Sequence, residues 1–233
     1  MSAHTYPTRR NSGFTLLELM IVTAVLASIA GSAILMVGQT EESVQGKLAI
    51  TEACTVREAL IQFKKDTGYL PKQGPFALVN DGGSVPIPEE GADWFSSPAN
   101  FIQLIENPLA GTTHPLATWN PDTKRGWRGP YLSTSSEGRV DIGSALNTDG
   151  TGSPTLGTII DDVMAIADPY LATPDGNYYT WTTPFSGDEM KRMGRPYLFF
   201  DADDTAKARI VGMGPNRRYD LGIGDDVVFY LFR

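Results

Sequence analysis

The sequence predicts an α+β protein, with a long N-terminal α-helix followed by a small antiparallel β-sheet domain with long loops. No proline interrupts the chain between Phe14 and Asp66, whereas glycine and proline are frequent from Gly68 onward. Short stretches rich in aromatic and β-branched residues follow near the C-terminus. Helical sequence first and strand sequence later is typical of an α+β fold. The 233 residues are enough for one domain with an appendage.

The first part of the predicted helix is apolar enough to lie in a membrane. Glu18 is the only ionisable residue between Phe14 and Val37. As a helix, this run would span roughly 36 Å, which exceeds the ~30 Å thickness of a bilayer core. Arg9 and Arg10 precede the run, and basic residues favour the cytoplasmic side of a membrane. We therefore expect a single-pass anchor, with the C-terminal domain on the opposite side.

The second part of the predicted helix is amphipathic. Its apolar residues recur at alternating spacings of four and three, which places them on one helix face: Ala49, Ala53, Val56, Leu60 and Phe63. Gly68 and then Pro71 are expected to end the helix. Cys54 lies beside the apolar face, so we expect a small buried or half-buried residue and not a nucleophile.

The remaining chain contains one predicted short helix and three predicted strands. Residues 100–106, with the sequence NFIQLIE, read as a helix with Asn100 as the N-cap. Three stretches are rich in aromatic and β-branched residues and are predicted as strands: Arg195–Asp203, Ala208–Gly214 and Asp226–Phe232.

The composition excludes several classes of function. The net charge of −8 argues against a nucleic-acid groove, because phosphate binding needs a basic surface. A single cysteine cannot form an intramolecular disulfide. The two histidines, His4 and His114, argue against a zinc site of the Cys/His type, and His114 is expected in a solvated loop.

Glu18 requires an explanation, because a carboxylate within a bilayer costs a few kcal/mol and marks a functional candidate. The stretch GFTLLELMIV, residues 13–22, resembles the class III signal of type IV pilins and type II secretion pseudopilins. This resemblance implies that a prepilin peptidase cleaves after Gly13 and that the new amino terminus, Phe14, is methylated. It also implies that Glu18 pairs with the amino terminus of a neighbouring subunit. Two opposite charges in a low-dielectric layer are each costly alone and much less costly together.

Further motifs resemble the major pseudopilin of type II secretion. They are DTGYLPKQGPFALV (Asp66–Val79), GWRGPYL (Gly126–Leu132), DPY (Asp168–Tyr170), GRPYLFF (Gly194–Phe200) and the glycine-rich C-terminal end. The sequence departs from that family at Leu35, where a proline is common. Residues 133–167 and 171–193 are additional to a minimal major pseudopilin.

The resemblance implies a structural subunit of a type II secretion pseudopilus, not an enzyme. The expected division is a leader at 1–13, a transmembrane or fibre-core half of the helix at 14–38, an amphipathic half at 39–67 and a periplasmic domain at 68–233. The implied partners are the prepilin peptidase, further copies joined through N-terminal helices, the inner-membrane platform and the minor pseudopilins. The protein would lie in the bacterial inner membrane before assembly.

Three alternatives stay open at this stage. A type IV pilin would share the N-terminus, although a single cysteine cannot provide the C-terminal disulfide that many such pilins carry. A minor, tip-located pseudopilin would fit the additional segments. A membrane-anchored enzyme would need paired acids such as Asp161 with Asp162 or Asp203 with Asp204, which we interpret as solvated charges. The four tryptophans, Trp94, Trp119, Trp127 and Trp181, would fill the core or, alternatively, stack on sugar rings.

The C-terminal loop, Met213–Asp226, is a candidate calcium site. It contains four oxygen-bearing side chains interleaved with glycines: Asn216, Asp220, Asp225 and Asp226. Calcium takes six to eight oxygen ligands and tolerates irregular geometry. The resembling family binds calcium in this loop, whereas Arg217 and Arg218 oppose a cation. The alternative is a glycine-rich hairpin whose acids face water.

Overall fold

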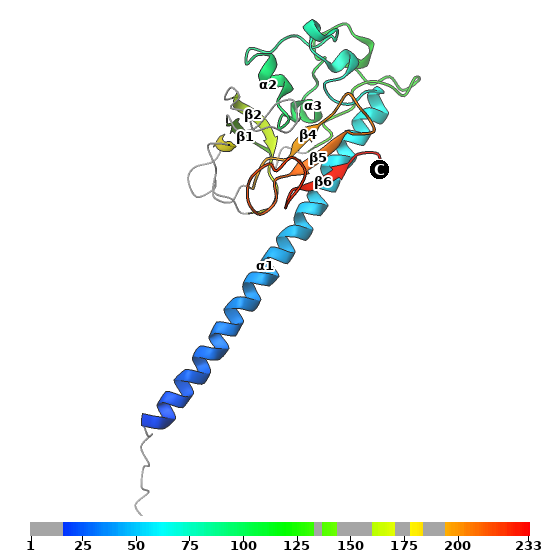
Figure 1. Cartoon of the computed structure of the whole chain (residues 1–233). Coiled ribbons are helices and arrows are strands. Elements are labelled where there is room, and N and C mark those ends of the chain that lie inside the picture. The colour runs from blue at the N-terminus through cyan, green and yellow to red at the C-terminus, as the bar shows by residue number, and fades with distance from the viewer. Residues whose placement is uncertain (1–15, 133–136, 144–159, 171–177, 184–193) are drawn as a thin grey trace, which may run out of the picture. The chain divides into compact units, whose positions relative to one another are not determined.

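The computed structural model describes residues 16–132, 137–143, 160–170, 178–183 and 194–233, with side chains at all of these positions except 32–43, 137 and 183 (Figure 1). The chain forms two compact units, residues 1–44 and residues 45–233. Each unit is described by itself below.

Helix α1, Leu16–Thr67, is one continuous helix of 52 residues. It ends where the sequence predicts, because Gly68 adopts a positive φ of 91° and its amide donates to the Lys64 carbonyl at 2.7 Å. A glycine at this position satisfies a carbonyl of the last turn at no steric cost. The prediction of a long helix ended by Gly68 is therefore confirmed, while its expected first residue, Phe14, lies outside the described residues.

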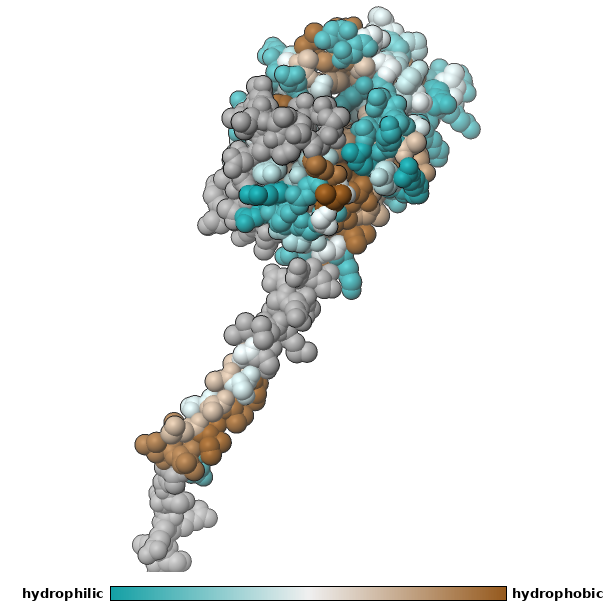
Figure 2. Space-filling view, in the orientation of Figure 1, coloured by the Kyte–Doolittle hydropathy of each residue, from teal (hydrophilic) through white to brown (hydrophobic). Residues whose placement is uncertain are grey.

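In the first unit, the apolar side chains of residues 16–31 are exposed, from 79% at Leu16 to 50% at Val25. Figure 2 shows them as a brown surface at the lower end of the described helix. Within the described residues, no helix combines the length and the hydropathy needed for a membrane span. The predicted span at 14–38 extends beyond the side chains that are described, so it stays a prediction.

In the second unit, α1 packs its predicted apolar face into the domain. All five residues of that face are buried: Ala49, Ala53, Val56, Leu60 and Phe63. Phe63 makes edge-to-face contacts with Phe76 and Tyr131, at ring-centroid distances of 4.9 and 5.4 Å. Cys54 is exposed, which corrects the expected burial. The residue occupies a solvent-facing position of the helix, between the buried Ala53 and the exposed Thr55.

The three predicted C-terminal strands form one antiparallel sheet. They are β4 (Leu198–Phe200), β5 (Arg209–Gly212) and β6 (Val227–Tyr230), in the order β4-β5-β6. The side chains of β4 are all buried, and those of β6 are half-buried or exposed. The α+β prediction is therefore confirmed, with each strand shorter than its predicted range.

A second antiparallel sheet was not predicted from the sequence. It contains β1 (Glu137–Ile142), β2 (Ile160–Ile166) and β3 (Tyr179–Thr183), in the order β2-β1-β3. The described part of the additional segments thus forms regular structure. Backbone hydrogen bonds connect this sheet to the chain before β4, because the Tyr197 amide donates to the Ile166 carbonyl at 2.9 Å.

Short helices complete the domain: η1 (Gly74–Phe76), η2 (Val79–Asp81), α2 (Ala92–Ser96), α3 (Ile102–Ile105) and η3 (Pro115–Ala117). The predicted helix at 100–106 is shorter than expected. Its N-cap position is Phe101, and the Asn100 side chain precedes it, where Oδ1 accepts a hydrogen bond from the Ile102 amide at 3.0 Å. Asn100 therefore forms a turn before the helix rather than its cap.

The tryptophans mainly support the core interpretation. Trp94 and Trp181 are buried, and Trp127 is half-buried against the core. The Trp119 ring is half-buried and is covered by the Arg128 guanidinium at 5.0 Å from its centroid.

His114 is half-buried, and its Nδ1 accepts a hydrogen bond from the Leu116 amide at 3.1 Å.

Candidate assembly segment, groove and closing loop

Glu18 lies in the first turn of α1, among the exposed apolar side chains. A carboxylate there interacts favourably with the positive end of the helix dipole. Gly13 and Phe14, the predicted cleavage and methylation residues, lie outside the described residues. The structure thus places one of the three predicted N-terminal site residues.

The side chains around Glu18 expose a large apolar area. Leu19, Ile21 and Leu26 are each 56–60% exposed in the isolated chain. Removing such area from water is favourable by ~25 cal/mol per Å². A helix that is apolar all round normally lies in a membrane or among other helices. Contact with lipid or with other helices would therefore be favourable for this segment.

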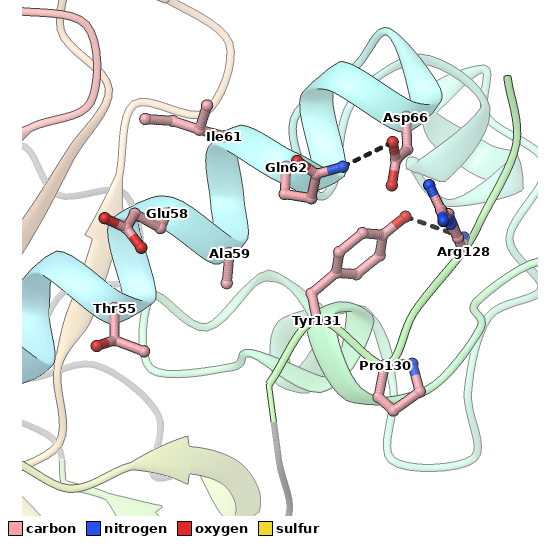
Figure 3. A pocket seen from close by; sticks show the side chains of 9 residues that line it. All are labelled: Thr55, Glu58, Ala59, Ile61, Gln62, Asp66, Arg128, Pro130 and Tyr131. Atoms are coloured by element: carbon pink, nitrogen blue, oxygen red, sulfur yellow. Dashed lines mark hydrogen bonds between the residues drawn. The ribbon is translucent and has the colours of Figure 1, made fainter. Parts of the chain in front are cut away.

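The domain half of α1 borders an open groove of about 660 Å³ (Figure 3). Figure 3 shows Gln62 and Asp66 on the helix facing Tyr131 and Arg128 on the opposite loop. Gln62 donates to Asp66 Oδ1 at 2.8 Å, and the Tyr131 hydroxyl accepts from the Arg128 amide at 3.0 Å. Burial raises the pKa of Tyr131 to about 12, so its hydroxyl stays protonated at neutral pH. The groove offers hydrogen-bonding groups, and the Thr55 hydroxyl in its lining donates to the Thr51 carbonyl at 3.2 Å.

In each of the two acid pairs that an enzyme would require, one aspartate forms an ion pair and the other is exposed. Asp162 forms an ion pair with Arg139 at 3.0 Å, and Asp161 beside it is exposed. Asp204 pairs with Lys207 at 3.2 Å in the turn before β5, while Asp203 is exposed. Neither pair lines the groove along α1, the groove beside Trp94 or the groove beside Trp119. The interpretation as solvated charges therefore fits the exposed Asp161 and Asp203, whereas Asp162 and Asp204 form ion pairs.

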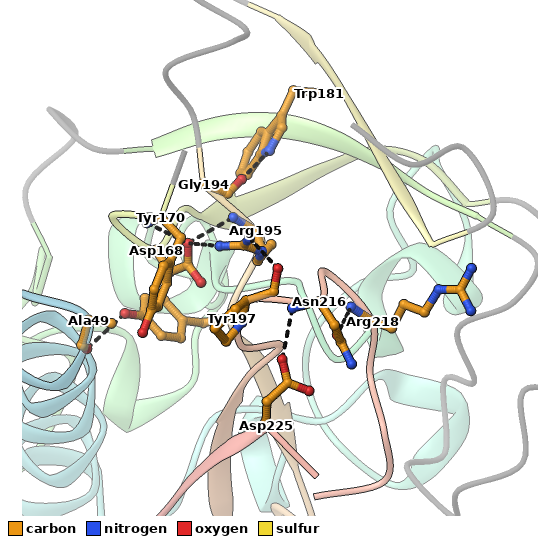
Figure 4. Close-up of polar contacts among 11 residues, drawn as sticks. Ala49, Asp168, Tyr170, Trp181, Gly194, Arg195, Tyr197, Asn216, Arg218 and Asp225 are labelled. Atoms are coloured by element: carbon orange, nitrogen blue, oxygen red, sulfur yellow. Dashed lines mark hydrogen bonds and ion pairs between the residues drawn. The ribbon is translucent and has the colours of Figure 1, made fainter. Parts of the chain in front are cut away.

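The four residues of the predicted calcium site are brought together in the closing loop, Met213–Asp226. Asp225 Oδ2 accepts from the Asn216 amide at 2.8 Å, as Figure 4 shows, and Asn216 Oδ1 accepts from the Arg218 amide at 2.7 Å. The Asn216 side-chain amide donates to Asp220 Oδ2 at 2.6 Å. These oxygens therefore hold the loop's own backbone and side chains.

Asp226 differs from the other three. Its Oδ2 accepts from the amides of Asp220 and Gly222, each at 2.8 Å. Its Oδ1 is buried and has no hydrogen-bond partner among the described residues. Burial raises the pKa of Asp226 to about 6, and the nearby negative charges of Asp220 and Asp225 act in the same direction. A cation near Oδ1 would satisfy this oxygen and reverse the electrostatic effect.

The donors fit a metal ion only in part. Within the described ranges, no group of three or more acidic, histidine or cysteine side chains is close enough to hold a metal ion. The residues predicted as ligands are neighbours, but their oxygens do not converge on one point. The predicted calcium site is therefore not preformed in this arrangement.

A second group of polar residues was missed by the sequence analysis. Asp168 and Arg195 are buried together, next to Tyr170 and Tyr197 (Figure 4). Burial raises the pKa of Asp168 to about 7, whereas the Arg195 amide and guanidinium lower it. The two residues belong to the DPY and GRPYLFF motifs, which drew attention as family resemblance only. The signal that could have indicated the pair is one acid and one base, each followed by proline and tyrosine.

Sequence comparison with known proteins places this chain in a family. The family described as the prokaryotic N-terminal methylation motif matches residues 8–34. The type II secretion system core protein G of Aeromonas hydrophila is 33% identical over 147 residues, which cover 61% of this chain and 86% of that protein. The chain belongs to the family of type II secretion core protein G. No solved structure matches the chain.

Membership in the core protein G family confirms the resemblance seen in the sequence. The chain is a pseudopilin of type II secretion, and its family is one of structural, non-enzymatic subunits. This membership also decides against the type IV pilin and the membrane-anchored enzyme. The methylation motif includes Gly13, Phe14 and Glu18 within its matched range and is consistent with anchoring in the inner membrane.

Proposed function

We propose that this pseudopilin works by polymerising through its N-terminal helix after removal of residues 1–13. The observation that carries the proposal is the exposed apolar segment of α1 with Glu18 in its first turn. In the proposed order of events, the prepilin peptidase first cuts after Gly13, and Phe14 becomes the methylated amino terminus. Subunits then leave the inner membrane, and their helices bundle into a periplasmic fibre with domain 68–233 outside.

The proposed role of Glu18 follows from the cost of a charge in apolar surroundings. Among the packed helices of a fibre, the Glu18 carboxylate and the amino group of Phe14 of a neighbouring copy would each be costly alone. Paired, the two charges offset much of that cost, and the pairing fixes the axial offset between subunits. The inner-membrane platform and the minor pseudopilins are the further partners that we propose for this assembly.

The assembly proposal is tested with Glu18→Ala in the full chain, produced together with a type II secretion system. We expect the variant to insert normally into the membrane and to lose residues 1–13, which mass spectrometry detects. We also expect little fibre in the sheared fraction. Glu58→Ala is the matched control, because Glu58 is an exposed acid on the same helix. Fibre yield from Glu18→Ala equal to that from Glu58→Ala would contradict the role of Glu18, and a start other than Phe14 would contradict the cleavage site.

We propose further that the closing loop binds calcium when the ion is supplied. The support is the buried, unpartnered Asp226 Oδ1 beside Asp220 and Asp225. An oxygen-rich loop is the ligand set that calcium prefers. Binding would connect β6 to the rest of the domain where no disulfide is possible. The loop would rearrange on binding, because the present hydrogen bonds occupy several of the oxygens.

The calcium proposal is tested by thermal melting of the full chain in detergent, with millimolar calcium and with a chelator. An ion that binds only the folded state stabilises it by ~2.7 kcal/mol at a hundred times its Kd. We expect calcium to raise the Tm of wild type and of Asp203→Asn, an exposed acid outside the loop, but not of Asp226→Asn. A Tm that calcium leaves unchanged in wild type would refute the site.

A further inference from the structure

The charged side chains of Asp168 and Arg195 lie deep inside the domain. Their side chains are only 2% and 4% exposed, and Arg195 Nη1 lies 3.8 Å from Asp168 Oδ1. Taking two charges out of water costs several kcal/mol per ion unless geometry and hydrogen bonds compensate. An apolar pair would fill the same space without that cost. The buried pair therefore calls for a role beyond filling the core.

Asp168 fixes the chain that enters β4. Its Oδ1 accepts from the backbone amides of Tyr170 and Arg195, each at 3.0 Å. Gly194 lies so close that a Cβ there would collide with the Asp168 carbonyl oxygen. The Trp181 indole on β3 donates to the Gly194 carbonyl at 2.8 Å. Segment 194–195 is thus held against the end of β2 and against β3, both in the second sheet.

Arg195 extends this fixed segment to the closing loop. Its Nη2 donates to the Pro215 carbonyl at 3.1 Å, directly before Asn216. Its guanidinium also lies over the Tyr170 ring, 4.9 Å from the centroid. Figure 4 shows Arg195 between Asp168 and Asn216 of the closing loop. One guanidinium therefore contacts both the chain directly after β2 and the start of the closing loop.

We propose that Asp168 and Arg195 form a positioning pair that fixes the start of the closing loop to the second sheet. The described part of the additional segments, 133–167 and 171–193, then has a definite role, which is to support the loop that precedes β6. Arginine suits this role because its planar guanidinium keeps its charge beside Asp168 while one of its nitrogens donates to the Pro215 carbonyl. The proposal goes beyond the assembly mechanism and does not require a bound ion.

The test is amide hydrogen exchange of the full chain carrying Arg195→Lys, measured in detergent with chelator present. Lysine keeps a positive charge beside Asp168 but carries one ammonium group in place of the guanidinium fork, so we expect it to lose the hydrogen bond to the Pro215 carbonyl. We expect the loop amides of Asn216, Asp220 and Gly222 to exchange about tenfold faster. The amides of Gly143 and Leu231, which report on the second sheet and on β6, keep their wild-type rates.

Arg139→Lys is the matched control, because Arg139 also pairs with an aspartate and lies on β1. It should leave the exchange of the loop unchanged. Equal loop exchange in the two variants would overturn the proposal. So would a uniform increase across the domain in Arg195→Lys, because that would indicate a general loss of stability.

Two further measurements keep the proposal testable if Arg195→Lys does not fold. Asp168→Asn is nearly isosteric and keeps an oxygen acceptor, and it should also accelerate the loop amides selectively. In wild type, exchange in low urea should give the loop amides and the Arg195 amide the same opening free energy. Loop amides that open independently of the Arg195 amide would show that the pair does not position the loop.

Discussion

The N-terminal segment of α1, residues 16–31, and its domain segment, residues 45–67, belong to one helix but differ in where their apolar side chains go. In the first, Leu19 and Leu26 are 60% and 59% exposed, while in the second Leu60 and Phe63 are fully buried. Polar groups follow the same division. Thr23 bonds to carbonyls of its own helix, whereas Arg57 donates to the carbonyls of Tyr230 and Leu231. One apolar face of the domain segment is thus buried within the chain, whereas the apolar side chains of the N-terminal segment are exposed.

The largest difference in the free energy of unfolding is expected when a leucine is replaced by alanine in each of the two segments. Leu60→Ala removes a fully buried side chain and should lower the free energy of unfolding by about 2–5 kcal/mol. Leu26→Ala should leave it unchanged within about 0.5 kcal/mol. Urea unfolding of the full chain, followed by tryptophan fluorescence, checks both values. Comparable losses in the two variants would mean that residues 16–31 also pack within the isolated chain.

The difference between the hydrogen bonds of Arg57 and Thr23 should give the second-largest effect on the free energy of unfolding. Arg57→Lys loses the forked donation to the Tyr230 and Leu231 carbonyls, at 3.0 and 2.6 Å. Hydrogen bonds from charged groups contribute about 1.5–3 kcal/mol, so we expect a loss in that range or somewhat below it. Thr23→Val is the control and should be nearly neutral for unfolding. An Arg57→Lys protein as stable as wild type would show that these bonds add nothing to the packing of α1.

The turn after the domain segment should add a pH dependence. Burial lowers the pKa of Lys72 to about 7, and its Nζ donates to the Ser97 carbonyl at 2.6 Å. The unfolded chain, where the lysine pKa is about 10.4, then binds more protons than the folded chain between about pH 7 and 10. The free energy of unfolding should therefore rise with pH over that window. Lys72→Met should remove this increase, and urea unfolding at several pH values measures it. An unchanged slope would exclude Lys72 as its origin.

The smallest effect is expected at Cys54. Its side chain is exposed although it lies next to the buried Ala53. Cys54→Ser should change the free energy of unfolding by less than about 0.5 kcal/mol, which the same urea titration detects. The matched substitution Ala53→Ser places a hydroxyl in the core and should cost more. Similar results for both would mean that the helix face is less sharply divided than the burial indicates.

Much of the fold followed from local sequence. The 3.6-residue periodicity at Ala53, Val56 and Leu60 identified the buried face, and Gly68 identified the helix end, because both signals act within a few residues. The strands β4, β5 and β6 were evident from their aromatic and β-branched residues. The second sheet was missed, since β1 with the sequence EGRVDI and β2 with IDDVMAI carry charges that obscure alternation. Their stability comes from pairing across a long separation in sequence.

The sites divide in the same way. The N-terminal signal GFTLLELMIV by itself indicated the superfamily of type IV pilins and pseudopilins, because such a signal is a linear segment of the chain. The assignment to type II secretion needed the motifs of the C-terminal domain. The closing loop was found by composition, but only the tertiary structure decided that Asp225 and Asp226 hold backbone amides. It also decided that Asp168 meets Arg195, since two residues 27 positions apart become partners only when β2 and the chain before β4 lie side by side. A buried charge is specified by what surrounds it, and that information is not local in sequence.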